Sequence, residues 1–433
     1  MNLAGSCRIF NYWEENNMGE SITDIWVYFH QAAMKDAKCI GVLSAHFSKG
    51  RRSFSFEYDK DWVASNEQIL LDPDIGWYSG PQYPARKENF GVFLDSMPDS
   101  WGRTLMQRRE PQRAIEEGRS VKKLNDVDYL LGVYDESRMG ALRFKLDPDG
   151  PFLETATSKT VPPWTSLGEL QEAVKAVESD ENDDNIRDWI VMLLAPGSSL
   201  GGARPKANFT DRANDPWIAK FPSKNDTTDK AAWEFLAYRM AVKAGINMAP
   251  SKLTKLSGRN NTFLTKRFDR LKNERLHFAS AMTMTGNTEE NIRDSRPSYL
   301  EIAEFIKFSG ASNREDLRQL WRRIVFNISV SNTDDHLRNH GFLLTAKGWR
   351  LSPAFDVNPS IDKQGLALNI DTDYNDLDYD LARSTGEFFM LDLKSMDEII
   401  SEVKSVVRSW RKYASSIGVL KAEQEMMIPA FRF

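Results

Sequence analysis

The sequence predicts an α+β fold in which a β-rich N-terminal part precedes a helical C-terminal part. The prediction rests on how the spacing of apolar residues changes along the chain. Residues alternate with a period of two in three early stretches, which are residues 25–29, 39–43 and 53–58. Helical spacing dominates roughly 295–331 and 376–420. We therefore expect an antiparallel sheet at the beginning of the chain and a helical lobe at its end.

The clearest helical pattern lies near the C-terminus. Ser395 and Glu398 have the S-x-x-E spacing of a capping box, in which two side chains satisfy free backbone N–H groups at the start of a helix. Ile399 and Val403 follow on one apolar stripe, and Gly418 comes after the end of the pattern. We expect this helix to begin with the capping box.

Composition favours a soluble globular protein of a reducing compartment. The chain has 433 residues, enough for two or three domains, and 41% of them are hydrophobic. A formal net charge of -5 argues against broad binding to a nucleic-acid backbone, which needs clustered basic residues. Cys7 and Cys39 are its two cysteines, so we expect neither a disulfide framework nor a zinc site.

No apolar run is long enough for a transmembrane helix. The first residues also lack the basic, apolar and small-residue progression of a signal peptide. We therefore expect a cytoplasmic location and no membrane partner.

A glycine-rich stretch occupies the middle of the chain, at residues 195–209. Gly201 and Gly202 allow the backbone to come close to a ligand, and exposed N–H groups in such a loop can bind phosphate oxygens. The stretch matches neither a Walker A motif nor G-x-G-x-x-G, so an ordinary turn remains an alternative.

Lys220 lies in an apolar strand expected at residues 217–221, after another strand expected at 206–210. A lysine in such surroundings needs a partner, unless it faces solvent at the edge of a sheet. Glu234 lies early in a helix expected at 229–244, where its carboxylate could meet Lys220.

The most informative stretch is a polar run that follows an apolar, helix-like segment at 317–330. Asp334 and Asn339 have the D-x-x-x-x-N spacing with which a protein kinase places its base beside a metal-binding amide. A hairpin expected at 341–351 comes next, and Asp356 then follows where a kinase has its other magnesium ligand. Aspartate and asparagine are also common turn residues, so the spacing alone is weak evidence.

The order of these parts is that of a protein kinase. A glycine-rich loop, a strand lysine, a helix glutamate, a further strand, D-x-x-x-x-N and a late aspartate follow one another. The literal H-R-D and D-F-G strings are missing, so an ordinary eukaryotic-type kinase is excluded. A metal-dependent phosphatase or nuclease is an alternative, but such an enzyme would need neither Lys220 nor the loop.

The same stretches resemble the HipA family, the serine/threonine kinase toxins of HipA and HipB toxin–antitoxin modules. The resemblance rests on five strings: T-D-D-H-L-R-N with L-S-P-A-F-D, S-S-L-G-G-A-R-P-K-A, W-I-A-K-F-P, F-L-T-K-R-F-D-R and M-G-A-L-R-F. It covers nearly everything from about residue 23 onward. It implies a protein-kinase-like, two-lobed fold: an extension at 1–22, a β-rich subdomain at 23–160, a mixed small lobe at 161–270 and a helical large lobe at 271–433.

The resemblance also implies roles for single residues. Asp334 is the expected catalytic base, chosen over Asp335 because of the spacing to Asn339, and Asn339 and Asp356 are the expected magnesium ligands. His336 is expected to be structural, because the base and metal roles are already filled.

The expected ATP site is built from several segments of the small lobe. Lys220 contacts the phosphates, supported by Glu234, and Gly201 and Gly202 form the loop around them. The hinge, whose backbone meets adenine, comprises Lys266, Arg267 and Phe268.

Ser199 corresponds to the serine that such kinases phosphorylate on themselves, with Ser198 as an alternative. A doubly charged group there would repel ATP phosphates or seek basic partners elsewhere, so the kinase would switch off.

The implied partners are a dimeric helix-turn-helix antitoxin like HipB, with DNA reached only through it, and a protein substrate. In the best-known branch of the family the substrate is glutamyl-tRNA synthetase, an aminoacyl-tRNA synthetase. The rival interpretation is a catalytically silent co-repressor that binds the antitoxin on operator DNA. The intact set of Asp334, Asn339, Asp356 and Lys220 favours the kinase.

Overall fold

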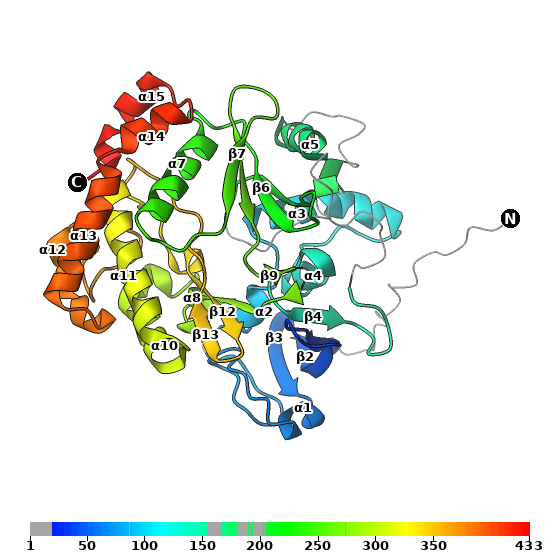
Figure 1. Cartoon of the computed structure of the whole chain (residues 1–433). Coiled ribbons are helices and arrows are strands. Elements are labelled where there is room, and N and C mark those ends of the chain that lie inside the picture. The colour runs from blue at the N-terminus through cyan, green and yellow to red at the C-terminus, as the bar shows by residue number, and fades with distance from the viewer. Residues whose placement is uncertain are drawn as a thin grey trace.

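Two antiparallel sheets and a helical lobe form the part of the chain described by the computed structural model, which covers residues 20–85, 87–153, 166–179, 189–190, 192–193, 202, 204–272 and 274–433. The helices of the C-terminal part lie on one side of the molecule, and the N-terminal sheet lies on the other (Figure 1). The second sheet lies in the upper middle of this view, above the N-terminal sheet and to the right of the helical lobe.

The N-terminal sheet contains four antiparallel strands in the order β3-β2-β1-β4. The three predicted early strands are confirmed, and each of them is longer than the alternating pattern suggested. The bounds are β1 Glu20–Phe29, β2 Lys38–Ser48, β3 Arg51–Tyr58 and β4 Leu142–Lys145. Between β3 and β4 the chain forms the helices α1 Lys60–Ala64, α2 Gly91–Leu94, α3 Ser100–Glu116 and α4 Asp126–Leu131.

The second sheet has the order β5-β6-β8-β7. The strands expected at 206–210, 217–221 and the helix expected at 229–244 are confirmed. The bounds are α5 Leu167–Ser179, β5 Lys206–Thr210, β6 Pro216–Lys220, α7 Lys230–Lys243, β7 Ser251–Thr254 and β8 Thr262–Lys266. Figure 1 shows α7 beside β7, on the side of this sheet that faces the helical lobe.

The helical lobe begins after two short strands, β9 Arg270–Leu271 and β10 Glu274–Arg275. Its central helix, α11, is buried at nearly every position from Asp316 to Val330, so it forms the middle of the lobe. The expected hairpin is confirmed as β12 and β13, and β11 pairs with β12. The bounds are β11 Phe278–Ser280, α8 Ala281–Met284, α9 Ile292–Ser295, α10 Tyr299–Ser309, α11 Asn313–Val330, β12 Gly341–Thr345, β13 Gly348–Leu351, α12 Tyr379–Ser384, α13 Leu393–Val407, α14 Trp410–Ser416 and α15 Lys421–Met426.

The predicted start of α13 is wrong by one turn. The helix begins at Leu393, and Asp392 is its N-cap, accepting a hydrogen bond from the backbone N–H of Ser395 at 2.8 Å. Asp392 and Ser395 are both residues that favour the N-cap. The helix therefore starts one turn earlier than predicted, and Met396 and Ile399 are among its buried residues.

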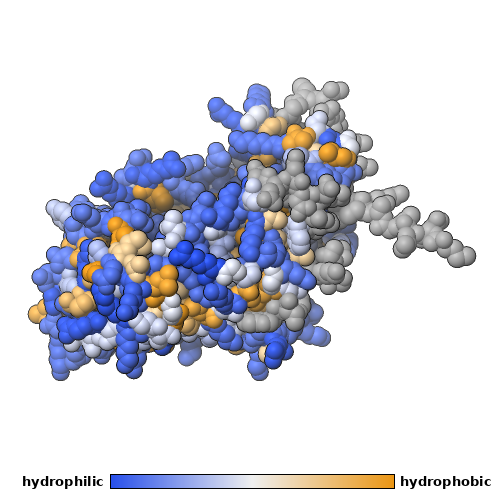
Figure 2. All heavy atoms as spheres, turned by 90° about the horizontal axis from the view of Figure 1, so that it is seen from above, coloured by the Kyte–Doolittle hydropathy of each residue, from blue (hydrophilic) through white to orange (hydrophobic). Residues whose placement is uncertain are grey.

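Buried apolar residues form two cores. One joins the N-terminal sheet, α3 and α5 with one face of the second sheet. The other joins α7 with the helical lobe and the β12–β13 hairpin. Hydrophilic residues cover most of the face seen in Figure 2, with hydrophobic residues in small groups. Among the described residues, no helix is both long enough and apolar enough to span a bilayer.

Candidate active site

A pocket lies between the second sheet, α7 and the segment 354–357 that follows β13. The alternation of side chains along a strand explains how the sheet serves both the pocket and the core. Ile218 and Lys220 of β6 line the pocket, whereas Trp217 and Ala219 pack into the N-terminal core. The pocket is therefore at the boundary between the two cores.

Lys220 is held in this pocket between two carboxylates. Its Nζ lies 2.6 Å from Glu234 Oε1 and 2.6 Å from Asp356 Oδ1. Burial alone would lower the pKa of Lys220, but the two carboxylates outweigh burial and raise it. The expected contact between Lys220 and Glu234 is confirmed. Asp356 is a second partner, which comes from 136 residues further along the chain.

Asp356 is the more open of the two carboxylates, with 29% of its side chain exposed against 7% for Glu234. Burial alone would raise the pKa of Asp356, but the ammonium of Lys220 lowers it to about 2. The carboxylate is therefore ionised at neutral pH. Its backbone is in the left-handed region at φ 56°, which aspartate tolerates better than most residues and which aims the side chain into the pocket.

Asp334 lies in the turn after α11 and faces solvent. The helix ends at Val330, and Ser331 closes it in a left-handed backbone conformation. The side chain of Asp334 is 80% exposed, and its Oδ1 lies 3.9 Å from the Nζ of Lys363. An exposed carboxylate with one distant cation can accept a proton from an incoming hydroxyl group.

Asp335 has the opposite surroundings and is nearly fully buried. Its Oδ2 accepts hydrogen bonds from the Tyr299 hydroxyl at 2.5 Å, from Asn327 Nδ2 at 2.8 Å and from His340 Nε2 at 2.8 Å. Burial alone would raise the pKa of Asp335, but His340 and the hydrogen bonds outweigh it and lower the pKa. The contacts explain why the neighbour of Asp334 is structural.

Asn339 offers an oxygen that no described residue uses. Its Nδ2 donates to the backbone oxygen of Asp334 at 3.0 Å, whereas its Oδ1 is buried without a hydrogen-bond partner among the described residues. A buried amide oxygen without a hydrogen-bond partner lowers the stability of the fold, unless a ligand binds it. Together with the carboxylate of Asp356 it forms an oxygen donor pair of the kind that magnesium takes in phosphate-binding sites.

Two hydrogen bonds attach the segment after Asp356 to the turn that carries Asp334. The Asn358 N–H donates to Asn332 Oδ1 at 3.2 Å, and the Ser360 N–H donates to the backbone oxygen of Ser331 at 3.2 Å. Asp334 and Asn339 themselves do not line the pocket. The structure thus brings Lys220, Glu234 and Asp356 together in one cluster and places the D-x-x-x-x-N turn beside it.

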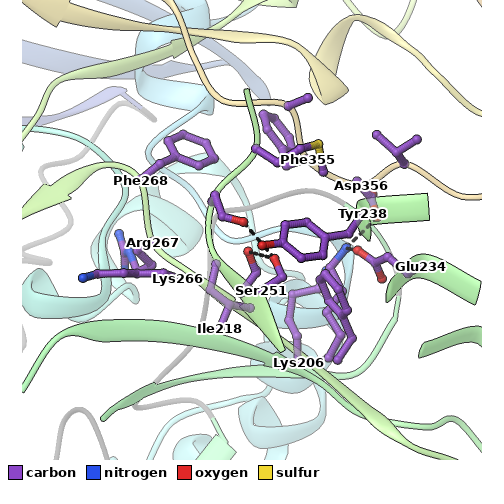
Figure 3. A pocket seen from close by; sticks show the side chains of 17 residues that line it. Lys206, Ile218, Glu234, Tyr238, Ser251, Lys266, Arg267, Phe268, Phe355 and Asp356 are labelled. Carbon is purple, nitrogen blue, oxygen red and sulfur yellow. Dashed lines mark hydrogen bonds and ion pairs between the residues drawn. The ribbon is translucent and has the colours of Figure 1, made fainter. Parts of the chain in front are cut away.

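The hinge residues Lys266, Arg267 and Phe268 line the end of the pocket opposite Glu234 and Asp356 (Figure 3). The side chains of the first two are occupied elsewhere: Lys266 Nζ lies 2.5 Å from Asp215 Oδ2, and Arg267 binds Asp269 at 2.7 Å. The Lys266 and Arg267 N–H groups also donate to backbone oxygens. Backbone carbonyls and Phe268 are what this end of the pocket offers to a ligand.

Only part of the glycine-rich loop belongs to the described residues. Gly202 is described, whereas Gly201, Ser199 and Ser198 lie outside the described ranges. Arg204 turns away from the pocket, with Nη2 2.8 Å from Asp226 Oδ2.

Sequence reasoning missed Lys206, which also lines the pocket. A signal was available, because a hairpin formed by residues 206–210 and 216–220 pairs Lys206 directly with Lys220. The partner of Lys206 is Asp99, from the N-terminal part of the chain. No local pattern in the sequence connects those two residues.

Comparisons with known proteins show which family the chain resembles. The model of the HipA-like C-terminal domain family matches residues 198–410. "Putative kinase Y4mE" of Sinorhizobium fredii is 26% identical over 150 residues, which are 33% of this chain and 34% of the relative. A "Putative kinase" of Haemophilus influenzae is 25% identical over 179 residues, 37% of this chain and 52% of the relative. The chain thus matches about half or less of the length of these curated relatives.

A solved structure extends the similarity to almost the whole chain. It is the complex of the HipA and HipB toxin–antitoxin system of Shewanella oneidensis with its operator DNA. The match has a TM-score of 0.63 with 19% identity and covers 94% of both chains. The predicted α+β, protein-kinase-like fold is confirmed.

Proposed function

We propose that this chain, which is a member of the HipA family, is an ATP- and magnesium-dependent kinase that phosphorylates serine or threonine side chains of a protein. The observation that carries the proposal is the Lys220 cluster. A buried lysine lies between a helix glutamate and an aspartate in a pocket, and a turn with an exposed aspartate lies beside that pocket. The similarity to proteins described as kinases supports the same activity.

The residues of the site fit ATP and magnesium. Lys220 would hold the phosphates, and the hinge Lys266–Phe268 would hold adenine through its backbone, opposite the charged cluster. Asn339 Oδ1 and the Asp356 carboxylate would hold magnesium, consistent with the orphaned buried oxygen of Asn339.

The chain itself has two tasks in the reaction. When bound, ATP would supply the phosphoryl group, and magnesium would neutralise its charge. Lys220 positions the phosphate tail, and Glu234 keeps that lysine in place. Asp334 orients the substrate hydroxyl and takes its proton, a role that its solvent exposure permits. The buried contacts of Asp335 fix the turn on which Asp334 stands.

The biological role that we propose is a toxin held by a HipB-like antitoxin dimer. The structural relative is part of a complex that contains HipB and operator DNA, and we propose a corresponding partner for this chain, with DNA reached through it. An aminoacyl-tRNA synthetase such as glutamyl-tRNA synthetase is the proposed substrate. Phosphorylation of Ser199 by the kinase itself is the proposed off switch.

The test is phosphate incorporation measured by intact mass. The purified protein is first treated with phosphatase and then incubated with ATP and magnesium, alone and with candidate substrates, before peptide mapping. We expect one added phosphate on Ser199 in the parent and none in Asp334→Asn, which keeps the size of the side chain but cannot accept the proton. Asp373→Asn removes an exposed carboxylate elsewhere in the lobe and should behave as the parent.

Two results would contradict the proposal. Equal labelling of the parent and Asp334→Asn would show that Asp334 is not the base. No labelling of any protein by the parent would support the silent co-repressor instead.

A further inference from the structure

The backbone of the turn after α11, rather than a contact of the side chain, sets where the Asp334 carboxylate lies. This side chain is 80% exposed, and its closest charged neighbour among the described residues is Lys363 at 3.9 Å. Asn339 depends on the same backbone, because its Nδ2 donates to the backbone oxygen of Asp334 at 3.0 Å. A shift of the turn would therefore displace both groups.

The turn begins at Ser331, which has a backbone conformation that serine seldom adopts. Its φ is 49° and its ψ is 50°, in the left-handed region, where a residue with a Cβ is less stable than glycine. Ser331 is buried, and its backbone oxygen accepts hydrogen bonds from the N–H groups of Thr333 at 2.8 Å and Ser360 at 3.2 Å. Contacts with other residues must hold this conformation, because the residue does not favour it by itself.

Arg432 supplies a contact to Ser331 from 101 residues further along the chain. Its Nη1 donates to Ser331 Oγ at 2.7 Å and to the backbone oxygen of Pro429 at 2.8 Å. The backbone N–H of Arg432 donates to the oxygen of Ser329 at 2.8 Å. That oxygen is among the last four carbonyls of α11, which have no partner within the helix, and a cation near this end of a helix is favourable.

The segment that carries Arg432 is anchored by contacts that do not involve the guanidinium. The ring of Phe431 stacks on Trp410 of α14, with 4.2 Å between the ring centroids. The backbone oxygen of Arg432 accepts a hydrogen bond from the Tyr379 hydroxyl at 2.9 Å. A change of the Arg432 side chain should therefore leave the segment in place and remove only the contact with the turn.

We propose that Arg432 is a positioning residue for phosphoryl transfer: its guanidinium holds Ser331 in the left-handed conformation and thereby fixes Asp334 and Asn339. The inference rests on the proposed function, because it adds a residue to the machinery of that kinase. Arg432 does not line the pocket, so its effect on the reaction passes through the turn.

Two substitutions separate this role from a general effect on stability. Arg432→Met keeps most of the apolar length of the side chain but removes the charged donor. A hydrogen bond from a charged donor is worth a factor of about 10 to 100, and because other bonds still hold Ser331, we expect phosphate incorporation to slow about 5- to 20-fold. Ser331→Gly removes the hydroxyl group and the strain together, so Arg432→Met should change the rate less than about twofold in this background.

The experiment compares phosphatase-treated parent, Arg432→Met, Ser331→Gly, the double variant and the control Arg411→Met, whose arginine stands on α14 and binds Glu425. Phosphate incorporation at saturating ATP and magnesium is followed by intact mass, and hydrogen–deuterium exchange is measured for peptides that cover residues 331–340. We expect faster exchange of these peptides in Arg432→Met, and parent-like exchange and rate in the control. Adenosine affinity, measured by calorimetric titration, should be the same in all proteins, because the turn does not line the pocket.

The outcomes distinguish the inference from the proposed function. If the parent incorporates no phosphate, the proposed kinase fails, and hydrogen exchange alone decides whether Arg432 holds the turn. Unchanged exchange of residues 331–340 in Arg432→Met overturns the inference, and so does an equal loss of rate with and without Ser331→Gly. Should Arg432→Met fail to fold, Ser331→Ala decides, because it removes the acceptor and keeps the strain: a rate equal to that of the parent overturns the inference.

Discussion

Replacing Asp335 by alanine should destabilise the helical lobe strongly, whereas the same change at Asp334 should leave stability unchanged. The two residues are neighbours in the sequence, but one is nearly fully buried and the other is 80% exposed. Oδ2 of Asp335 accepts from three donors, Tyr299, Asn327 and His340. Alanine would leave all three donors without their acceptor in the interior.

The magnitude follows from those three bonds. A hydrogen bond to a charged group contributes about 1.5–3 kcal/mol, but bonds that share one acceptor atom do not add fully. Removing one side of a buried charged network costs about 3–5 kcal/mol. We expect a loss of this size for Asp335→Ala and a smaller loss for Asp335→Asn, whose amide oxygen can still accept. Exposed Asp334→Ala should change the free energy of unfolding by less than about 0.5 kcal/mol.

Urea unfolding followed by tryptophan fluorescence measures the difference, provided that the slope with denaturant is unchanged. The effect should also depend on pH. The folded pKa of Asp335 is lowered, so its contribution is complete above the unfolded value of about 3.9 and is lost as pH falls through the lower folded value. Equal midpoints for Asp335→Ala and Asp334→Ala at pH 7 would refute the reasoning.

Two further predictions concern buried residues outside the turn that carries Asp334. Burial lowers the pKa of His277 to about 3. In the unfolded chain this histidine has its ordinary pKa of about 6.5, so below that pH protonation favours the unfolded state. The free energy of unfolding should therefore fall by about 2–3 kcal/mol between pH 6.5 and pH 4.5. His277→Phe should reduce this loss in urea titrations, and an unchanged pH dependence would contradict the assignment. Arg267→Lys should lower the melting temperature. Lysine cannot reproduce the hydrogen bonds that Arg267 donates to Asp269 and to the backbone oxygens of Ser137 and Arg138. An unchanged melting temperature would show that these contacts do not contribute to stability.

Much of the local structure was predictable because it depends on residues close together in the sequence. Alternation identified the early strands, and helical spacing identified α7 and α11. The contact between Lys220 and Glu234 was also within reach, since a strand and the next helix separate them by only 14 residues. The start of α13 was not predictable, because Asp392 and Ser395 are both residues that favour the N-cap, and the local sequence does not distinguish between them.

The contact between Asp356 and Lys220 could not be predicted in the same way. Asp356 was expected as a metal ligand from its position after the hairpin, but its contact with Lys220 depends on how the two cores meet. The contacts of Lys206 with Asp99 and of Arg267 with Ser137 span 107 and 130 residues. Neither depends on a local spacing, so sequence periodicity contains no information about them.

These long-range contacts change how the N-terminal part should be understood. Its residues share one core with the sheet that carries Lys206 and Lys220, so it is not packed as an independent unit. Asp99 contacts the end of the pocket expected to hold phosphates, and the backbone oxygens of Ser137 and Arg138 bind the hinge arginine at the other end. A displacement of this part would therefore move groups at both ends of the pocket. A partner that binds the N-terminal part would therefore have a direct structural route to the pocket in which we propose that a nucleotide binds.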